Sequence, residues 1–496
     1  MIVAELDYER KRNVGRILLN DKYWLDKLAY EFSAPNPQKK FVKGIKKHWV
    51  KDRTYFIRPT GYFNFGLAEQ IVEWLKANVD PMALEFKFSD AFLERYSKDP
   101  DCEPENNLKF ELREYQHNSV KLALKYRFGT FVLGTGAGKT FTIACIIDNL
   151  LRRKGVKRAM ILVPDNNLVL QFHDELINQY GLEGRYCLFY DKYNEIDPKA
   201  NIIIANRPLF LARFEQNKKF FREQIDCLVV DEAHSIKKSN KVSECVGMMR
   251  AWYRFGFTGT LAEEPEDKFK TLGLLGKVRY EKTSKSLRDA GFLTPVTARL
   301  LNLNHPKVVR HIITQEGRKK GLNYQDEVEV LQKDEKRNKF LANLCLSLNH
   351  NTLILVNRLE HGFNLEQMLK DLNVEGSKKI YFIRGEIEAT ERDEVRRMME
   401  DEDDIVCVAI TKIFSTGINI KNLHNVIFAA GGKSAITVVQ AIGRGLRLHA
   451  NKKRLNIFDI ADVGYTYSMK HREKRVLIYK KEQIPTKLYD CDVPED

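Results

Sequence analysis

The stretch FGTFVLGTGAGKTFT, residues 128–142, most constrains how this chain can fold. Mostly apolar residues of high β propensity run into a glycine-rich turn, and apolar residues at helical spacing follow from Phe141 to Leu151. A strand, a turn and a helix starting at Lys139 place backbone N–H groups and the positive end of a helix dipole around one concavity. Residues without bulk let the backbone approach phosphate oxygens, as at Gly134, Gly136 and Gly138. We therefore predict a phosphate-binding loop.

Each residue of this loop has an expected task. Backbone groups of the turn would line the phosphates, at Thr135, Gly136, Ala137 and Gly138. The Lys139 amine would reach the β- and γ-phosphates, and the Thr140 hydroxyl would hold Mg²⁺. Leu133 stands where the strict pattern has glycine, but that outer position lies at the strand end. The alternative is a glycine turn with an incidental lysine.

Composition bounds the class of protein. The chain has 496 residues, a length typical of about three domains. Its formal net charge of +15 favours a polyanionic partner, although a merely basic soluble protein would also carry such a charge. The eight cysteines form no CxxC pair, so we expect reduced core thiols and no cysteine zinc site. No apolar run is long enough for a signal peptide or a membrane span, which predicts a soluble cytoplasmic protein.

Residues 1–105 are predicted to form a separate small α+β module. Apolar spacing indicates helices at Tyr23–Phe32 and Ala68–Leu75, and a polar segment at 98–107 suits a linker. Between the helices, basic residues alternate with aromatic ones, which suits phosphate neutralisation and base stacking. The candidate nucleic-acid contacts are Lys43, Lys46, Lys47 and Trp49. A solvated basic hairpin is the alternative.

Two series of short apolar strands alternate with helical segments in the rest of the chain. Continuous apolar runs are typical of strands buried on both faces of a parallel sheet. The first series (residues 106–285) has strands near 131–133, 159–163, 201–205, 227–231 and 255–258. The second (residues 286–496) has them near 352–357, 379–384, 405–409, 426–429 and 455–458. We therefore predict an α/β protein with two tandem parallel-sheet lobes and a cleft between them.

Asp231 and Glu232 follow an apolar strand of the first lobe. Ligands bind at the carboxyl ends of such strands, where one acid could hold Mg²⁺ and its neighbour could orient the attacking water. A helix N-cap would explain an isolated pair, but this pair accompanies a phosphate loop. Upstream, Arg113 and Gln116 offer a guanidinium and an amide that could contact an adenine edge.

In the second lobe, Arg444 and Arg447 lie one helical turn apart in QAIGRGLR. If the lobe closes, they would meet the γ-phosphate as arginine fingers, and a solvated basic helix face is the alternative. Gly417 and Asn419 belong to a candidate switch loop or a plain turn. Near the C-terminus, basic residues crowd one segment at Lys470, Arg472, Lys474 and Arg475, and His471, Arg475 and Tyr479 recur there at helical spacing. We favour phosphate contacts for part of this face, with plain solvation as the alternative, and residues 482–496 are predicted to be a loose end.

The ordered set of motifs resembles the superfamily 2 helicases, and among them the phage recombination and repair DNA helicases of the T4 type. The motifs are LREYQ, GTGAGKT, LVPDNNLVLQF, DEAH, FGFTGTL, Arg337-Asn338, FSTGINI and QAIGRGLR. The resemblance implies two RecA-like lobes and an ATP- and Mg²⁺-dependent motor on branched DNA: forks, Holliday junctions, D-loops and R-loops, or an RNA–DNA hybrid. It implies roles in recombination, repair and replication, and we expect a monomer in solution, in the host cytoplasm if the chain is phage-encoded.

Residue roles follow from the same resemblance. Lys139, Asp231 and Glu232 would act in catalysis, with Glu232 as base. Thr258 and Thr260 would couple hydrolysis to movement, Gln171 would lie near nucleic acid, and Gly417 and Asn419 would sense both ligands. The chain departs from the pattern at Ala205-Asn206-Arg207, where relatives often carry a Thr-x-Gln strand contact.

Two other classes of function remain open at this point. The chain could be the duplex-translocating motor of a restriction-type system, with a nuclease as a partner. It could instead be a nucleic-acid binding or annealing module whose ATP site gates affinity.

Overall fold

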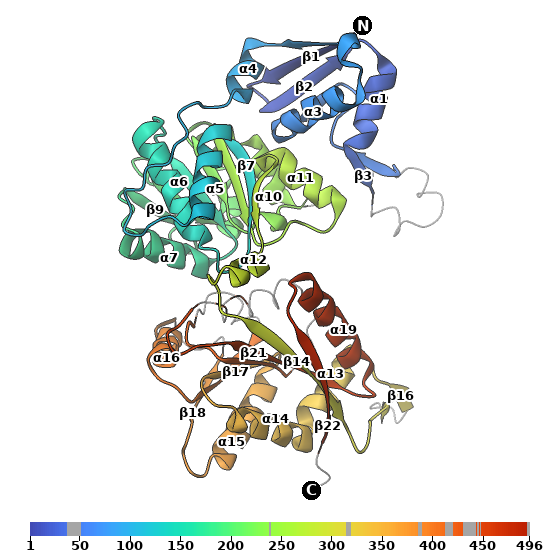
Figure 1. Ribbon diagram of the computed structural model, residues 1–496, viewed down its shortest axis with the longest axis vertical. Coiled ribbons are helices and arrows are strands. Elements are labelled where there is room, and N and C mark those ends of the chain that lie inside the picture. The colour runs from blue at the N-terminus through green and yellow to red at the C-terminus, as the bar shows by residue number, and fades with distance from the viewer. Residues whose placement is uncertain are drawn as a thin grey trace. The chain divides into compact units, whose positions relative to one another are not determined.

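The computed structural model describes residues 1–36, 51–237, 240–313, 319–384, 389–411, 420–429, 443, 446 and 448–493. They divide into two compact units, Met1–Lys282 and Thr283–Asp496 (Figure 1). The three-domain division at residues 105 and 285 stays a prediction. No helix in the described part of the chain is long and apolar enough to cross a membrane.

A small mixed sheet begins the first unit. The elements here are β1 (Ile2–Glu9), β2 (Val14–Leu19), α1 (Lys22–Glu31), β3 (Ser33–Pro35), β4 (Arg53–Tyr55), β5 (Tyr62–Asn64), α3 (Ala68–Asn78), β6 (Leu84–Phe88) and α4 (Asp90–Tyr96). The sheet order is β5-β2-β1-β6, with β1 antiparallel to β2 and parallel to β6. Along β1, Ala4, Leu6 and Tyr8 are buried while Glu5 and Asp7 are exposed, the alternation of a sheet with one covered face. Both predicted helices are confirmed.

This sheet shares a hydrophobic core with the first parallel sheet. Phe56 stacks on Phe269 with ring centroids 5.1 Å apart, and the Glu69 carboxylate pairs with Arg279 at 2.5 Å. The backbones also approach closely, because a Cβ placed on Gly66 would lie 2.4 Å from the Leu272 carbonyl oxygen. Only glycine fits that contact without displacement.

The first parallel sheet has the order β13-β7-β12-β11-β8-β10-β9. Its strands are β7 (Phe128–Leu133), β8 (Ala159–Val163), β9 (Tyr186–Phe189), β10 (Ile202–Asn206), β11 (Cys227–Val230), β12 (Tyr253–Thr258) and β13 (Val278–Lys282). Its helices are α5 (Glu114–Tyr126), α6 (Lys139–Arg153), α7 (Asn166–Asp174), α8 (Arg207–Arg213), α9 (Lys218–Glu223), α10 (Lys241–Met248) and α11 (Pro265–Leu275). Every residue of β7, β8, β10, β11 and β12 is buried, because helices cover both faces (Figure 1).

The second unit is built on another parallel sheet, ordered β18-β19-β17-β20-β21-β14-β22. Its strands are β14 (Val296–Asn304), β17 (Thr352–Val356), β18 (Lys379–Ile383), β19 (Ile405–Ile410), β20 (Asn425–Phe428), β21 (Leu455–Asp462) and β22 (Thr486–Asp492). The other elements are α12 (Ser284–Asp289), the β15 (His311–Ile313) and β16 (Lys319–Gly321) hairpin, α13 (Tyr324–Lys333), α14 (Glu335–Ser347), α15 (Leu359–Leu372), α16 (Ala389–Asp401) and α19 (Thr466–Lys481). Two seven-stranded parallel sheets and a small mixed sheet confirm the predicted fold class.

Two predictions about the C-terminal end are wrong. Residues 486–492 are not loose, because they form β22 and pair with β14. The helix face at His471, Arg475 and Tyr479 is buried and cannot contact phosphate, whereas Lys470 and Lys474 are exposed and their phosphate contacts stay a prediction. Arg475 pairs with both oxygens of Asp459, at 2.9 and 2.6 Å, and Tyr479 donates to the same carboxylate at 2.6 Å.

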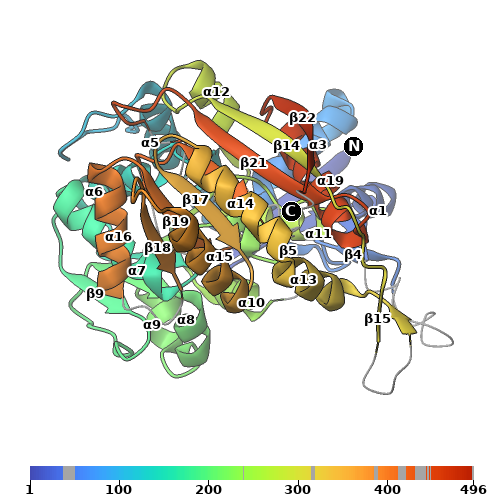
Figure 2. The ribbon, with the colours of Figure 1, turned by 90° about the horizontal axis from the view of Figure 1, so that it is seen from below.

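Alternation along β21 explains this burial. Phe458 and Ile460 lie in the core cluster with residues of α14 and α15, two helices that Figure 2 shows lying against this sheet. Asp459 therefore points to the opposite face, where α19 must satisfy its buried charge. His471, Arg475 and Tyr479 recur at helical spacing because they form the face of α19 that packs against the sheet.

Candidate active site

The predicted phosphate loop lies between β7 and α6. Ala137 N–H donates to the Gly134 carbonyl at 3.1 Å, which closes the turn. Gly138 caps the helix with φ +73°, in the left-handed region, and a Cβ there would lie 2.6 Å from Gln116 Nε2. A side chain at position 138 is therefore strained by the backbone conformation and would also displace the Gln116 amide. Thr135, Gly136 and Ala137 complete the loop, as the sequence predicts.

The start of α5 supports the loop from beneath. Gln116 Nε2 donates to the Ala137 carbonyl at 3.1 Å, and the Tyr115 hydroxyl donates to the same oxygen at 2.8 Å. Arg113 contributes its backbone N–H to Gln116 Oε1 at 3.0 Å and its guanidinium to the Tyr115 hydroxyl at 3.2 Å. Arg113 and Gln116 thus lie directly behind the loop, and their contact with adenine stays a prediction.

The acidic pair lies at the same edge of the sheet. β12 lies between β7 and β11, so the loops that leave these three strands meet at their carboxyl ends. Lys139 Nζ lies 3.7 Å from Glu232 Oε1, with side chains 16% and 19% exposed. Residues separated by about ninety positions in the sequence therefore form one charged pair.

The two carboxylates have opposite electrostatic environments. Burial and the neighbouring Glu232 raise the pKa of Asp231 to about 6. Burial opposes ionisation of Glu232, but Lys139 and His234 lower its pKa to about 2. Glu232 is therefore charged at neutral pH. Asp231 Oδ1 is buried and has no hydrogen-bond partner among the described residues, which fits an oxygen reserved for a cation such as Mg²⁺.

His234 links the acidic pair to the end of β12. Its Nδ1 lies 3.2 Å from Glu232 Oε2 and 2.8 Å from the Thr258 hydroxyl. The Thr258 hydroxyl in turn donates to the Thr260 carbonyl at 2.7 Å. The sequence predicted Thr258 and Thr260 as coupling residues but did not single out His234, whose place in the DEAH motif was the available signal.

Arg207 was also missed, and it holds the loop that carries the acidic pair. Its guanidinium donates to the carbonyl oxygens of Asp231 and Glu232, the latter at 3.1 Å, and to the Ser235 hydroxyl. The loop needs this support because Glu232 has φ +48°, a left-handed conformation rare for residues with a side chain. The signal in the sequence was the departure at residues 205–207 from the pattern of the relatives.

Gln171 is the described site residue that does not join this cluster. Gln171 lies on α7, where its Nε2 donates to Glu175 Oε1 at 2.7 Å. Outside the described residues lie Lys43, Lys46, Lys47, Trp49, Gly417, Asn419, Arg444 and Arg447.

Comparisons with known proteins agree with this site. The family model "Type III restriction enzyme, res subunit" matches residues 109–263, and "Helicase conserved C-terminal domain" matches residues 335–449. The chain is 26% identical over 404 residues to the ATP-dependent DNA helicase uvsW of Enterobacteria phage T4, covering 76% of this chain and 77% of that protein. It is 25% identical over 437 residues to the DNA 3'-5' translocase XPB2 of Sulfurisphaera tokodaii, covering 79% and 93%.

A solved structure shows the same fold. The ATP-dependent Type ISP restriction-modification enzyme LlaBIII bound to DNA superposes with a TM-score of 0.58 at 15% identity, covering 78% of this chain and 32% of that one. The two family models fall on the segments that carry the ordered motifs of the two lobes. The chain therefore belongs to the superfamily 2 helicases and is an ATP-dependent helicase or translocase.

Proposed function

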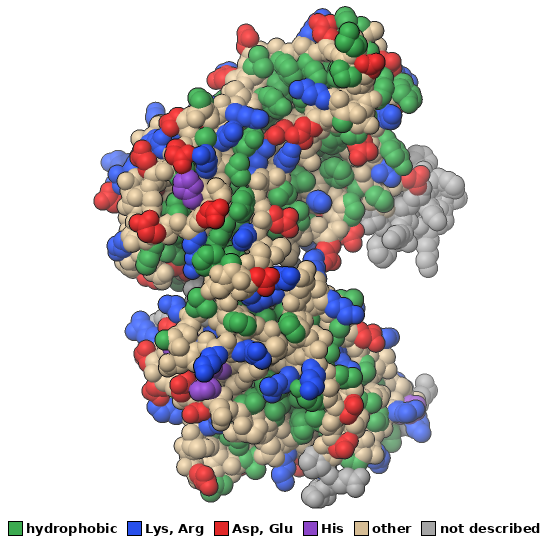
Figure 3. Space-filling model, in the orientation of Figure 1, with side chains coloured by type: hydrophobic (Ala, Val, Ile, Leu, Met, Phe, Trp, Pro, Cys, Tyr) green, Lys and Arg blue, Asp and Glu red, His purple; other side chains and the backbone are tan. Residues whose placement is uncertain are grey.

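We propose that this enzyme uses ATP to move along and unwind branched DNA, such as forks, Holliday junctions, D-loops and R-loops. The observation that carries the proposal is the continuous chain of contacts from Lys139 through Glu232 and His234 to Thr258. Similarity to a phage T4 DNA helicase and the net charge of +15 support DNA as the polyanion. Lys and Arg side chains also gather on the visible face of the second unit (Figure 3). We infer a role in recombination, repair or replication, and we propose that the enzyme acts in the cytoplasm.

In the proposed hydrolysis step, Lys139 and the backbone of the phosphate loop hold the triphosphate. Asp231 and the Thr140 hydroxyl would hold Mg²⁺, which when bound neutralises charge on the β- and γ-phosphates. Glu232, kept ionised by Lys139 and His234, orients the attacking water. Arg444 and Arg447 would supply the fingers, Arg113 and Gln116 the adenine contacts, and Gly417 and Asn419 the sensing loop.

Coupling to DNA follows from differential contact with the γ-phosphate. Loss of that phosphate changes the charge around Lys139 and Glu232, and His234 transmits the change to Thr258 and Thr260. Gln171 and the basic residues Lys43, Lys46 and Lys47, with Trp49, would contact the strand that is advanced.

An ATPase assay with single-stranded, duplex, forked and four-way DNA, and with an RNA–DNA hybrid, tests the proposal. We expect forked or four-way DNA to stimulate turnover most, and Lys139→Ala to abolish it. Arg444→Ala should keep ATP binding and lose hydrolysis. Absence of hydrolysis by the wild-type enzyme with every one of these DNAs would refute the proposal.

The match to a restriction-enzyme family model favours one alternative, a motor that translocates on duplex DNA without separating strands. Displacement of a triplex-forming strand without unwinding of a fork would identify that activity. Strand annealing that persists in Lys139→Ala would instead identify a binding module with an ATP gate. We propose that the enzyme is a monomer, which sedimentation without DNA tests.

A further inference from the structure

Three side chains with metal-binding chemistry meet at the amino edge of the second parallel sheet. His350 precedes β17, Asp403 precedes β19 and His424 precedes β20. Because β17 pairs in parallel with both β19 and β20, the segments that enter these strands lie side by side. One potential ligand atom from each residue lies within 4.8 Å of those of the other two. The carboxyl ends of the strands, where nucleotides bind in such folds, are at the opposite edge.

One buried amide ties these three segments together. Asn351 Nδ2 donates to the carbonyl oxygens of Met399, Glu402 and Asn422, at 2.7, 2.8 and 3.0 Å. Asn351 Oδ1 accepts from the Ile405 N–H at 2.9 Å. The backbone that carries the three side chains is therefore set by the fold and does not depend on an ion.

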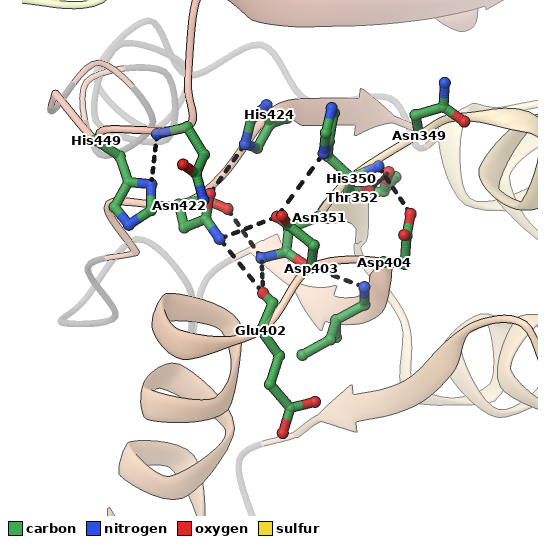
Figure 4. Close-up of polar contacts among 12 residues, drawn as sticks. Asn349, His350, Asn351, Thr352, Glu402, Asp403, Asp404, Asn422, His424 and His449 are labelled. Atoms are coloured by element: carbon green, nitrogen blue, oxygen red, sulfur yellow. Dashed lines mark hydrogen bonds and ion pairs between the residues drawn. The ribbon is translucent and has the colours of Figure 1, made fainter.

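A second amide positions two of the three side chains. Asn422 Oδ1 lies 2.9 Å from His424 Nε2, and Asn422 Nδ2 donates to Asp403 Oδ1 at 3.1 Å. The His350 ring stacks on the His424 ring with centroids 4.3 Å apart, and its Nδ1 lies 3.8 Å from Asp403 Oδ1. Figure 4 shows the two imidazoles side by side with Asp403 between His350 and Asn422. Hydrogen bonds that orient the ligating side chains are usual around such sites.

Among the described residues, the Asp403 carboxylate has no lysine or arginine partner, unlike its acidic neighbours. Asp403 lies in a run of five acidic residues, 400–404. Glu402 pairs with Lys379, and Asp404 pairs with Lys378 at 3.3 Å. In the described part of the chain, no lysine or arginine pairs with Asp403. A carboxylate beside two imidazoles therefore has no positive side chain of its own.

We propose that His350, Asp403 and His424 bind a divalent transition-metal ion of the Zn²⁺ class. Two imidazole nitrogens and one carboxylate oxygen form a common three-ligand zinc set, which leaves one position for water. Mg²⁺ and Ca²⁺ favour oxygen ligands and suit this set poorly. The ion would tie three segments of the second unit together and would stabilise it.

The burial of the ligands suggests how the site forms. Metal–ligand bonds of about 2.0–2.2 Å require the three atoms to come closer than they now lie. His424 is 6% exposed and is the fixed ligand. The His350 and Asp403 side chains are 48% and 36% exposed, so both can rotate toward an ion held by His424.

Titration of the full-length, tag-free protein with Co²⁺ and then Zn²⁺ tests the proposal. We expect one Co²⁺ per chain with visible d–d bands and no thiolate charge-transfer band. Zn²⁺ should displace it and raise the thermal midpoint by a few degrees. Asp403→Asn and His350→Asn should each weaken binding at least about tenfold. Asparagine suits position 350 because His350 has φ +66°, which asparagine tolerates.

Two control variants isolate the site. His311→Asn removes an exposed histidine on β15 and should bind Co²⁺ as the wild type does. Lys139→Ala should also bind Co²⁺ normally, because Lys139 belongs to the other unit. Binding that persists in both Asp403→Asn and His350→Asn, a thiolate band, or no stoichiometric binding would overturn the proposal. Each of these results leaves the ATPase proposal unaffected.

Discussion

Replacement of Arg207 by alanine is the sharpest test of how the active site is held. Arg207 is 9% exposed, and its guanidinium reaches the carbonyl oxygens of Asp231 and Glu232 and the Ser235 hydroxyl. Alanine removes all three contacts; the buried Asp231 carbonyl loses its guanidinium donor, while the Glu232 carbonyl keeps bonds from the Ser235 N–H at 3.0 Å and the Ser235 hydroxyl at 2.7 Å. The left-handed conformation of Glu232 then has no support from this side.

The expected magnitude follows from these contacts. Hydrogen bonds to a charged group contribute about 1.5–3 kcal/mol each, and water entering the space would recover part of the loss. We therefore expect Arg207→Ala to lower the free energy of unfolding by about 3 kcal/mol. Because Glu232 must be positioned within a fraction of an ångström, we expect DNA-stimulated kcat to fall by about 10²-fold. Arg207→Lys keeps the positive charge but loses the planar set of guanidinium donors. Its stability and its kcat should therefore lie between those of the wild type and those of Arg207→Ala.

Urea unfolding and steady-state ATPase measured on the same preparations check both numbers. Arg213→Ala is the matched control, because Arg213 ends the same helix and its guanidinium donates to Gln216 Oε1 at 2.8 Å, a bond at an exposed position that alanine removes without leaving a buried acceptor. It should change stability by less than about 0.5 kcal/mol. The reasoning about Arg207 fails if Arg207→Ala hydrolyses ATP at the wild-type rate and unfolds at the wild-type midpoint.

Three further predictions concern packing, pH and salt. Gly66→Ala should lower the unfolding free energy by about 1–3 kcal/mol, because its Cβ would press on the Leu272 carbonyl. Gly321→Ala is the control and should not lower it, because the space around Gly321 is open. Equal urea midpoints for the two variants would contradict this prediction. Burial opposes the charge on His305, but Asp334 and Asp462 raise its pKa to about 9. The contribution of charged His305 to folding stability is therefore complete below about pH 6.5 and is lost as the pH rises through about 9. The loss is up to about 3 kcal/mol, and His305→Gln should remove that pH dependence in urea titrations; an unchanged slope would count against the ion pairs. Stimulation of the ATPase by DNA should fall at least about tenfold between 50 and 200 mM salt while basal turnover holds, and salt-independent stimulation would argue against phosphate contacts.

Local sequence patterns were sufficient to predict most of the secondary structure. Continuous apolar runs identified strands such as β8 and β19 within a residue or so, because strands covered on both faces have no polar positions. The C-terminal strand β22 was missed, because most of its residues are exposed and show no apolar run, and because pairing with β14 holds them in place. Arg475 and Tyr479 were misassigned, since a basic helix face gives no sign of a buried partner such as Asp459.

The sequence by itself determined the phosphate loop, because Gly138 and the residues around it act through their own backbone. It also determined the presence of two parallel sheets, because period and polarity are local properties. Only the tertiary structure decided that His234 bridges Glu232 and Thr258, that Arg207 holds the acidic loop, and that His350 meets His424. The physical reason is strand order: parallel pairing brings together the ends of strands that are far apart along the chain, and no local pattern records which ends will be neighbours.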